Sequence, residues 1–214
     1  MKIILSVSVL LITALTGAFG QEAEFVLVKK GEGIFIYERW IKFPKSNPPI
    51  DAREVKGEFH FNNTMFEGVR LLQDEARISR WQSHVSEFKV YKTPDTTRWL
   101  EYSYHDIPWP VSDQDHLLVY TMEAHSANEL FITFESVVDN KLAPVKKGVT
   151  RMHLSGSWTF TKVSDTSVKA TYRILSTPLN IPKFLTDPII RNNMMTTIEE
   201  FIELIDRKSA ANAK

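Results

Sequence analysis

The 214-residue sequence contains no cysteine, which excludes disulfide bonds, cysteine-ligated zinc and a thiol nucleophile. It also lacks an excess of charge, since 26 lysines and arginines stand against 26 aspartates and glutamates. Nucleic-acid binding needs a basic stripe, and strong attachment to an anionic bilayer needs a basic cluster, so neither is expected. Internal repeats and low-complexity linkers are absent too. The fold must therefore be stabilised by a hydrophobic core alone.

The longest apolar run lies at the N-terminus and has the pattern of a bacterial secretory signal peptide. Lys2 supplies a positive charge, residues 3–15 are mostly apolar, and small residues around Ala18 precede a cleavage point. A transmembrane helix needs about 20 apolar residues, which this run does not reach. We predict a signal peptide at residues 1–20 and one domain at residues 21–208, periplasmic or secreted. An uncleaved N-terminal anchor is the alternative.

The rest of the sequence predicts many strands and few helices. Alternation of apolar and polar residues with period two is typical of strands that have one face in contact with water. It is clearest where Met152, Leu154, Trp158 and Phe160 share one face. A short helix is expected over residues 22–30. The predicted strands are residues 34–41, 53–61, 84–93, 97–105, 115–124, 129–138, 151–160 and 168–175.

Capping residues mark three further helix starts. Thr64 and Glu67 form a capping box, and Asp74 can cap a second short helix. Asp187 followed by Pro188 predicts the start of a long C-terminal helix. Its apolar stripe, at three- and four-residue steps, consists of Ile190, Met194, Ile198, Phe201, Ile202 and Ile205.

This order of elements predicts an α+β fold in which one curved antiparallel β-sheet wraps around a long C-terminal α-helix. Consecutive strands joined by short turns pair with each other in antiparallel fashion. A sheet of many strands twists and curls, so its apolar concave face needs a cover. Only the last helix is long and apolar enough to provide it.

A stiff loop separates two of the predicted strands and carries Trp109 between Pro108 and Pro110. The two prolines fix the backbone and remove two amide donors. The Ser-Asp-Gln-Asp segment that follows, residues 112–115, can close a turn with its side-chain oxygens. We expect the loop to present the indole ring at one end of the sheet.

Four segments together resemble the START (StAR-related lipid-transfer) domains of the helix-grip, or Bet v 1-like, superfamily. They are the Pro-Trp-Pro loop leading to Asp115, the strand with Gly156-Ser157-Trp158, the strand with Thr171-Tyr172, and residues 181–185. The resemblance covers about residues 24–207. It implies a helix-grip fold around an internal cavity.

Two places depart from the START pattern. Residues 176–180 replace an Asp-Pro-Gly-Gly segment, which predicts a stiffer loop at the entrance to the cavity. Tyr120 stands where sterol-carrying relatives have an arginine. Recognition of a sterol hydroxyl by a buried ion pair is therefore not expected.

The resemblance implies that a hydrophobic small molecule or lipid binds between the sheet and the last helix, in a carrier or a sensor. We expect no cofactor, a monomer, and transient contact with a membrane. Side chains that simply fill the core are the alternative, and a collapsed cavity would leave an interaction module. The candidate ligand-binding residues are Trp81, Trp99, Leu118, Tyr120, Met122, Phe134, Met152, Trp158, Tyr172, Met194, Ile198 and Phe201.

An enzyme of the cyclase or hydrolase type on the same fold is the alternative function. It would need an inward acid or base, and Glu101 and His105 share strand parity with Trp99. An outward surface position is the more frequent interpretation of such residues. Ser103, His105 and Asp106 do not have the spacing of a nucleophile–base chain. The histidines are isolated in the sequence, so no metal site is expected.

Overall fold

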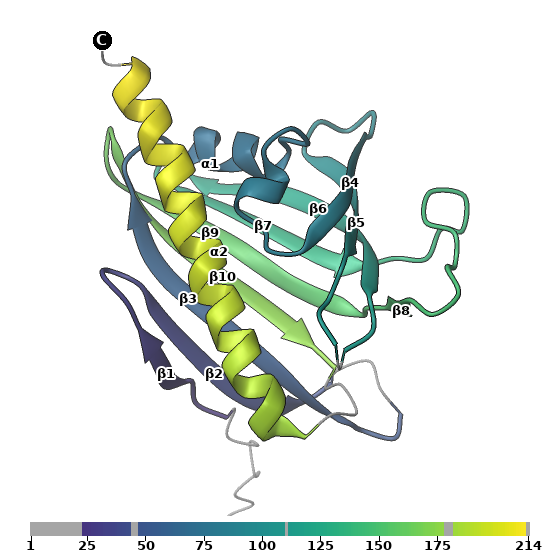
Figure 1. Ribbon diagram of the computed structural model, residues 1–214. Helices are drawn as coiled ribbons and strands as arrows, with labels where there is room; N and C mark the ends of the chain where they lie inside the picture. Colours follow the sequence, from purple (N-terminus) through teal and green to yellow (C-terminus); the bar gives the residue numbers. More distant parts are fainter. Residues whose placement is uncertain (1–22, 44–46, 110, 178–181, 213–214) are drawn as a thin grey trace, which may run out of the picture.

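The computed structural model describes residues 23–43, 47–109, 111–177 and 182–212, and its main feature is one curved β-sheet (Figure 1). The long C-terminal helix crosses one face of this sheet. The predicted signal peptide lies outside the described residues, as does most of the 176–180 loop. The elements are β1 (Val26–Lys30), β2 (Phe35–Lys42), β3 (Asp51–Phe61), α1 (Met65–Leu72), the 3-10 helix η1 (Ile78–Arg80), β4 (Val85–Lys92), β5 (Arg98–His105), β6 (Gln114–Ser126), β7 (Glu129–Ser136), β8 (Thr150–Arg151), β9 (Leu154–Ser164), β10 (Ser167–Ser176) and α2 (Lys183–Asn212).

The strands form one sheet in the order β1-β2-β3-β10-β9-β7-β6-β5-β4, with β8 beside β6. The pairs along this path are antiparallel, and β8 pairs with β6 in parallel. The first three strands join the later ones where β3 pairs with β10, with Val55 opposite Ile174. The α+β fold with a curved antiparallel sheet around a C-terminal helix is therefore confirmed.

The close packing of α2 against β3 depends on a glycine. A Cβ atom added to Gly57 would collide with Cδ1 of Ile198, which is fully buried on α2. Because glycine has no side chain, the helix can approach the concave face at this point. Val168 and Ala170 of β10 are buried on the same face, while Lys169 between them is exposed. The alternation in the sequence therefore identifies the inner face correctly.

The predicted helix at residues 22–30 is wrong, because Val26–Lys30 form strand β1 at the edge of the sheet. The turn after it lets the strand fold back on β2, with Lys30 opposite Phe35. In this turn the Gly31 amide donates to the Ile34 carbonyl at 2.9 Å, and Gly33 has a φ of 68°. A glycine that adopts positive φ without strain thus makes a hairpin here, and does not end a helix.

The predicted start of the last helix is also wrong by about one turn. α2 begins at Lys183, and the Leu185 amide donates to the Pro182 carbonyl at 3.0 Å. Pro188 therefore lies inside the helix, and Asp187 is not its cap. Asp187 instead accepts hydrogen bonds from Arg53 of β3, which is far away in the chain, and from Arg191 on the next turn of α2. A tertiary role has replaced the local one that the sequence suggested.

The two shorter helical segments differ in how well the sequence predicts them. The capping hydroxyl of Thr64 accepts a hydrogen bond from the Glu67 amide at 3.3 Å, and α1 follows as expected. After Asp74 only one short 3-10 helix forms, and its N-cap residue, Arg77, makes no side-chain capping bond. The Asp74 carboxylate bonds the Ala76 amide and the Arg77 side chain, so it closes a turn.

Candidate functional site

A cavity of about 360 Å³ lies between α2 and the concave face of the sheet. Its wall is formed by residues of β2, β3, β5, β6, β7, β9, β10 and α2, with the segment before β4. Pockets that hold ligands of drug size usually have volumes of roughly 300–1,000 Å³. The cavity is therefore large enough for one slender apolar molecule.

The predicted ligand-binding residues fall into two groups in the structure. Half of them border the cavity: Leu118, Tyr120, Phe134, Met152, Tyr172 and Met194. The others do not border it and belong to the packed interior or its edge: Trp81, Trp99, Met122, Trp158, Ile198 and Phe201. Strand parity predicts which side chains point inward, but it does not predict how far along each strand the interior stays open.

The packed part of the interior is an aromatic cluster around Trp158. The Trp158 ring stacks on Tyr172 with centroids 3.9 Å apart and on Phe201 with centroids 5.4 Å apart. Trp81 meets Phe201 edge to face at 5.3 Å, and Phe59 meets Phe201 at 5.9 Å. Such contacts stabilise a core beyond the area that they bury. Tyr172 is thus the boundary between this cluster and the cavity.

A carboxylate and two imidazoles border the cavity on β5 and β6. Glu101 is only 2% exposed, and its Oε1 lies 3.4 Å from Nε2 of His116. The rings of His105 and His116 are 5.2 Å apart. The interpretation of Glu101 and His105 as outward surface residues is therefore wrong. His105 and His116 are isolated in the sequence but lie close together in space. β5 and β6 pair with Ser103 opposite His116, and this register places Glu101 and His105 of β5 close to His116 of β6.

Burial changes the protonation of the groups around Glu101. It raises the pKa of Tyr120, and the charge of Glu101 raises it further. Burial raises the pKa of Tyr172, with the same carboxylate as second cause. Burial lowers the pKa of His105 to about 3, and the neighbouring His116 lowers it as well. The two hydroxyls are therefore hydrogen-bond donors at neutral pH, and His105 is a neutral imidazole.

Ser103 and His105 form a hydrogen-bonded pair that cannot serve as an exposed nucleophile. The Ser103 Oγ and His105 Nε2 atoms are 3.0 Å apart. Ser103 has no exposed surface and is not part of the cavity wall. A bound molecule could not reach its hydroxyl. Among the described residues, no group of three or more His, Asp or Glu side chains could hold a metal ion.

Basic and aromatic residues border the other side of the cavity, where α2 begins. Arg53 of β3 is 3% exposed, and its guanidinium carbon lies 4.9 Å from the centroid of the Trp40 ring. The Lys183 ammonium lies 3.5 Å from the same centroid. All three side chains are part of the cavity wall. Sequence reasoning missed this group because its members are far apart in the chain.

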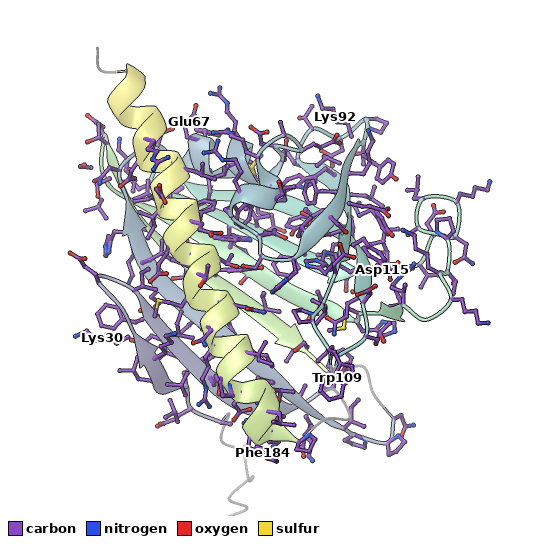
Figure 2. All side chains as sticks on the ribbon, viewed as in Figure 1. Lys30, Glu67, Lys92, Trp109, Asp115 and Phe184 are labelled. Atoms are coloured by element: carbon purple, nitrogen blue, oxygen red, sulfur yellow. The ribbon has the colours of Figure 1, made fainter. Side chains whose placement is uncertain are left out.

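Large apolar side chains are exposed at the end of the molecule near the start of α2. Trp109 is 92% exposed and Phe184 is 76% exposed, and both lie at the same end of the sheet (Figure 2). The Asp113 carboxylate closes the Trp109 loop by accepting from the Ile107 amide at 3.1 Å, as the turn residues predicted. Ile107 and Lys183, the neighbours of these two residues, border the cavity.

Asp115, which follows the Pro-Trp-Pro loop, is a buried residue whose contacts stabilise the fold. It is 1% exposed, and its two oxygens accept from Arg151 at 2.6 and 3.0 Å. The Tyr102 hydroxyl lies 3.4 Å from the same carboxylate. Asp115 therefore joins β8 and β5 to β6 and is not part of the cavity wall.

Across the described residues, no helix is both long and apolar enough to span a membrane.

Comparisons with known proteins agree with this architecture. No family model matches the chain. An uncharacterized protein of Pseudomonas aeruginosa is 23% identical over 179 residues, 82% of this chain and 84% of that one. A STAR-related lipid transfer protein of Xanthomonas axonopodis has 26% identity and a TM-score of 0.69, over 85% of this chain and 98% of that one.

Two further solved structures share the fold at lower identity. Human StAR-related lipid transfer protein 5 has a TM-score of 0.72 at 12% identity, over 89% of this chain and 90% of that one. The Zhui aromatase/cyclase of Streptomyces sp. R1128 has a TM-score of 0.54 at 8% identity, over 74% of this chain and 96% of that one. The chain therefore has the helix-grip fold of the START domains, and the resemblance to the START family that its sequence indicates is confirmed.

Proposed function

We propose that the protein binds one hydrophobic molecule of lipid size in the cavity between the sheet and α2, as a carrier or a sensor. The observation that supports this most is the cavity of about 360 Å³ inside an otherwise close-packed fold. Burial of apolar surface contributes roughly 25 cal/mol per Å², so a few hundred Å² offsets much of the cost of association. Micromolar affinity is within reach of such a site.

The lipid-transfer domains among the structural neighbours support the same class of ligand. The Xanthomonas protein named as a STAR-related lipid transfer protein covers most of this chain at 26% identity. Leu118, Phe134 and Met152 would contact the apolar part of the ligand, because they border the cavity. Tyr120 and Tyr172 would offer hydroxyl groups to a polar atom of the ligand.

Exchange of the ligand would take place at the end of the molecule that carries Trp109 and Phe184. These residues, with Leu185 and Ile189, expose apolar surface next to cavity-lining residues. Aromatic rings at such a position insert well into the interfacial region of a bilayer. We include transient membrane contact, a monomeric state and export by the N-terminal signal in the proposal.

The proposal is tested by extracting purified protein with organic solvent and by native mass spectrometry of the intact protein. We expect a bound apolar molecule at up to one per chain, lost after extraction and regained when lipid is added. Protein that carries no lipid, and that binds none from a panel of fatty acids, phospholipids and sterols, would exclude the proposed function.

An enzymatic function has one observation in its favour, the pair formed by Glu101 and His116. Their side chains lie 3.4 Å apart on the cavity wall, where they could move a proton to or from a bound molecule. The Glu101→Gln substitution separates the two functions. A carrier keeps its ligand affinity within a few-fold, whereas an enzyme loses turnover. Lipid extracted from the variant should change in mass on incubation with the unmodified protein only if the protein is an enzyme.

A further inference from the structure

One buried polar atom of the cavity wall has no hydrogen-bond partner. Nη1 of Arg53 is fully buried and makes no hydrogen bond, while Nη2 of the same side chain donates to Asp187. Oε1 of Glu38 lies 3.8 Å from Nη1, which is too far for a hydrogen bond. A buried donor on a charged group is costly when it is left without an acceptor. Arg53 is therefore prepared for an acceptor that enters the cavity.

The other buried donors without partners in the described residues do not share this position. They are the indole nitrogens of Trp81 and Trp99, and neither residue borders the cavity. Arg53 thus combines three properties: it is charged, it has a free donor, and it is in contact with the empty space. These three properties together indicate that Arg53 binds a polar group of a ligand. A residue that only packed in the core would not need a charged donor beside the cavity.

The charges around Arg53 leave one positive charge in excess. Arg191 pairs with Glu38 at 2.8 and 3.1 Å and with Asp187 at 3.4 Å. Arg53 shares both carboxylates, and Lys183 adds a third cation beside the same wall. In the described part of the chain, three basic side chains therefore face two acidic ones. An anionic group bound at this point would make the cluster neutral.

Among the described residues, other charged groups near this cluster do not remove the excess. Asp51, whose carboxylate also feels Lys183, is paired with Lys42 at 2.7 Å. The Trp40 ring is in contact with both Arg53 and Lys183 and holds the two cations against its electron-rich surface. Trp40 therefore keeps both cations close to its ring, near the start of α2.

We propose that the ligand is a single-chain lipid with an anionic headgroup, bound by Arg53 and Lys183 beside Trp40. This inference depends on the proposed function, and it adds the chemical class of the ligand. The anion, a carboxylate or a phosphate, accepts hydrogen bonds from Nη1 of Arg53 and from the Lys183 ammonium. The chain extends along the apolar wall toward Tyr120 and Tyr172. A volume of about 360 Å³ is at the low end for ligand pockets, which favours one chain over two.

The test compares ligands that share one chain and differ only in the headgroup. Hexadecanoic acid, hexadecyl phosphate and hexadecan-1-ol compete at pH 8 for the protein with Nile red, a neutral fluorescent probe. We expect the acid, the phosphate or both to bind at least about tenfold more tightly than the alcohol. Arg53→Met should remove this preference and Lys183→Gln should reduce it, while the affinity for the alcohol stays the same. Lys169→Gln, on the outer face of β10, is the control and should change nothing.

Each outcome decides the proposal. A preference for only the acid or only the phosphate identifies the anion and supports it. Equal binding of all three ligands, or a preference that persists in both variants, overturns it and leaves lipid binding intact. Binding of none of them, by protein that also yields no extracted lipid, would instead reject the proposed function. Lys183 is exposed, so the Lys183→Gln variant keeps the test valid if Arg53→Met does not fold.

Discussion

The two halves of the interior are built from the same strands and the same helix, yet one is packed and the other is open. In the packed half, α2 presents Phe201 and Ile198 to Trp158 and Trp81. In the open half, it presents Met194, Asn193 and Thr197 to the cavity. The comparison shows that the interior is filled where aromatic side chains of α2 and of the strands meet, and that it stays open where α2 presents Met194, Asn193 and Thr197.

The halves differ in polarity as well as in density. The packed half consists of aromatic and aliphatic side chains. The wall of the open half includes Glu101, His116 and Arg53, all of which are buried. Buried charges are costly to a core that only needs to be stable. Glu38, Glu54 and Asp115 are also buried, but they do not border the cavity. The open half thus differs from the aromatic cluster in having buried charged groups in its wall.

The largest effect on stability is expected from truncation in the packed half. Phe201→Ala removes a ring that contacts Trp158, Trp81 and Phe59, and it should lower the free energy of unfolding by about 3–5 kcal/mol. Leu118→Ala in the open half should cost only about 2 kcal/mol, because that side chain already borders empty space. Denaturant titration of both variants measures the difference. Equal losses would contradict the division into two halves.

Substitution of lysine at two adjacent positions of α2, Met194 and Met195, should have different effects on stability. Met195 is 3% exposed and packs away from the cavity, so Met195→Lys should destabilise the fold by about 3 kcal/mol or more. Met194 borders the cavity, so Met194→Lys can place its ammonium in that space and should cost about 1 kcal/mol.

Lipid binding should respond in the opposite way to the two lysines. Met194→Lys should weaken binding by at least about tenfold, because its side chain occupies the space of the apolar chain of the lipid and places an ammonium against it. Met195→Lys protein that remains folded should bind normally. Thermal unfolding together with lipid titration measures both quantities. If Met194→Lys lost folding to the same extent as Met195→Lys, the space beneath α2 would not be open.

A larger side chain should be tolerated in the open half of the interior but not in the packed half. Ala170 is fully buried opposite Phe160 and Phe59, so Ala170→Leu should cost about 1–3 kcal/mol. Leu118→Phe extends a side chain into the cavity and should change stability by less than about 1 kcal/mol while lowering the capacity for lipid. Unfolding and binding titrations check both. A stable Ala170→Leu variant would indicate unfilled space in the aromatic cluster.

The last prediction concerns the acid sensitivity of the open half, where the effect at any one step of pH is small. The unfolded chain protonates His105 near its ordinary pKa of about 6.5, whereas the folded protein holds this pKa at about 3. The unfolded state therefore binds more protons between these values, and stability falls as the pH is lowered from about 6.5 toward 3. His105→Gln should flatten this part of the curve by at most about 1.4 kcal/mol per pH unit. Parallel curves for the two proteins would show that folding does not lower the pKa of His105.

The fold was largely predictable because its signals are local. Alternation in β9 and β10 identified their inner face, and the stripe from Ile190 to Ile205 identified the helix that covers it. Where local signals competed with distant partners, prediction was wrong. Asp187 has the sequence pattern of a helix cap but serves as an acceptor for Arg53, which lies far away in the chain.

The candidate site was only half predictable from the sequence. Parity placed Leu118, Tyr120 and Tyr172 on the concave face, and all three border the cavity. It also placed Trp158 there, which is packed in the core. Whether an inward side chain meets another side chain or empty space depends on what the opposite element presents. That information is not contained in any one strand.

The sequence by itself determined most of the strands, the long C-terminal helix and the apolar face of each, because these follow from periods of two and 3.6 residues. Only the tertiary structure decided that Glu101 meets His116 and that Arg53 lies between Glu38, Asp187 and the cavity. Arg53 and Asp187 are separated by 134 positions in the chain. Contacts at such separations arise from strand pairing and helix docking, and these steps placed charged groups around the open half of the interior.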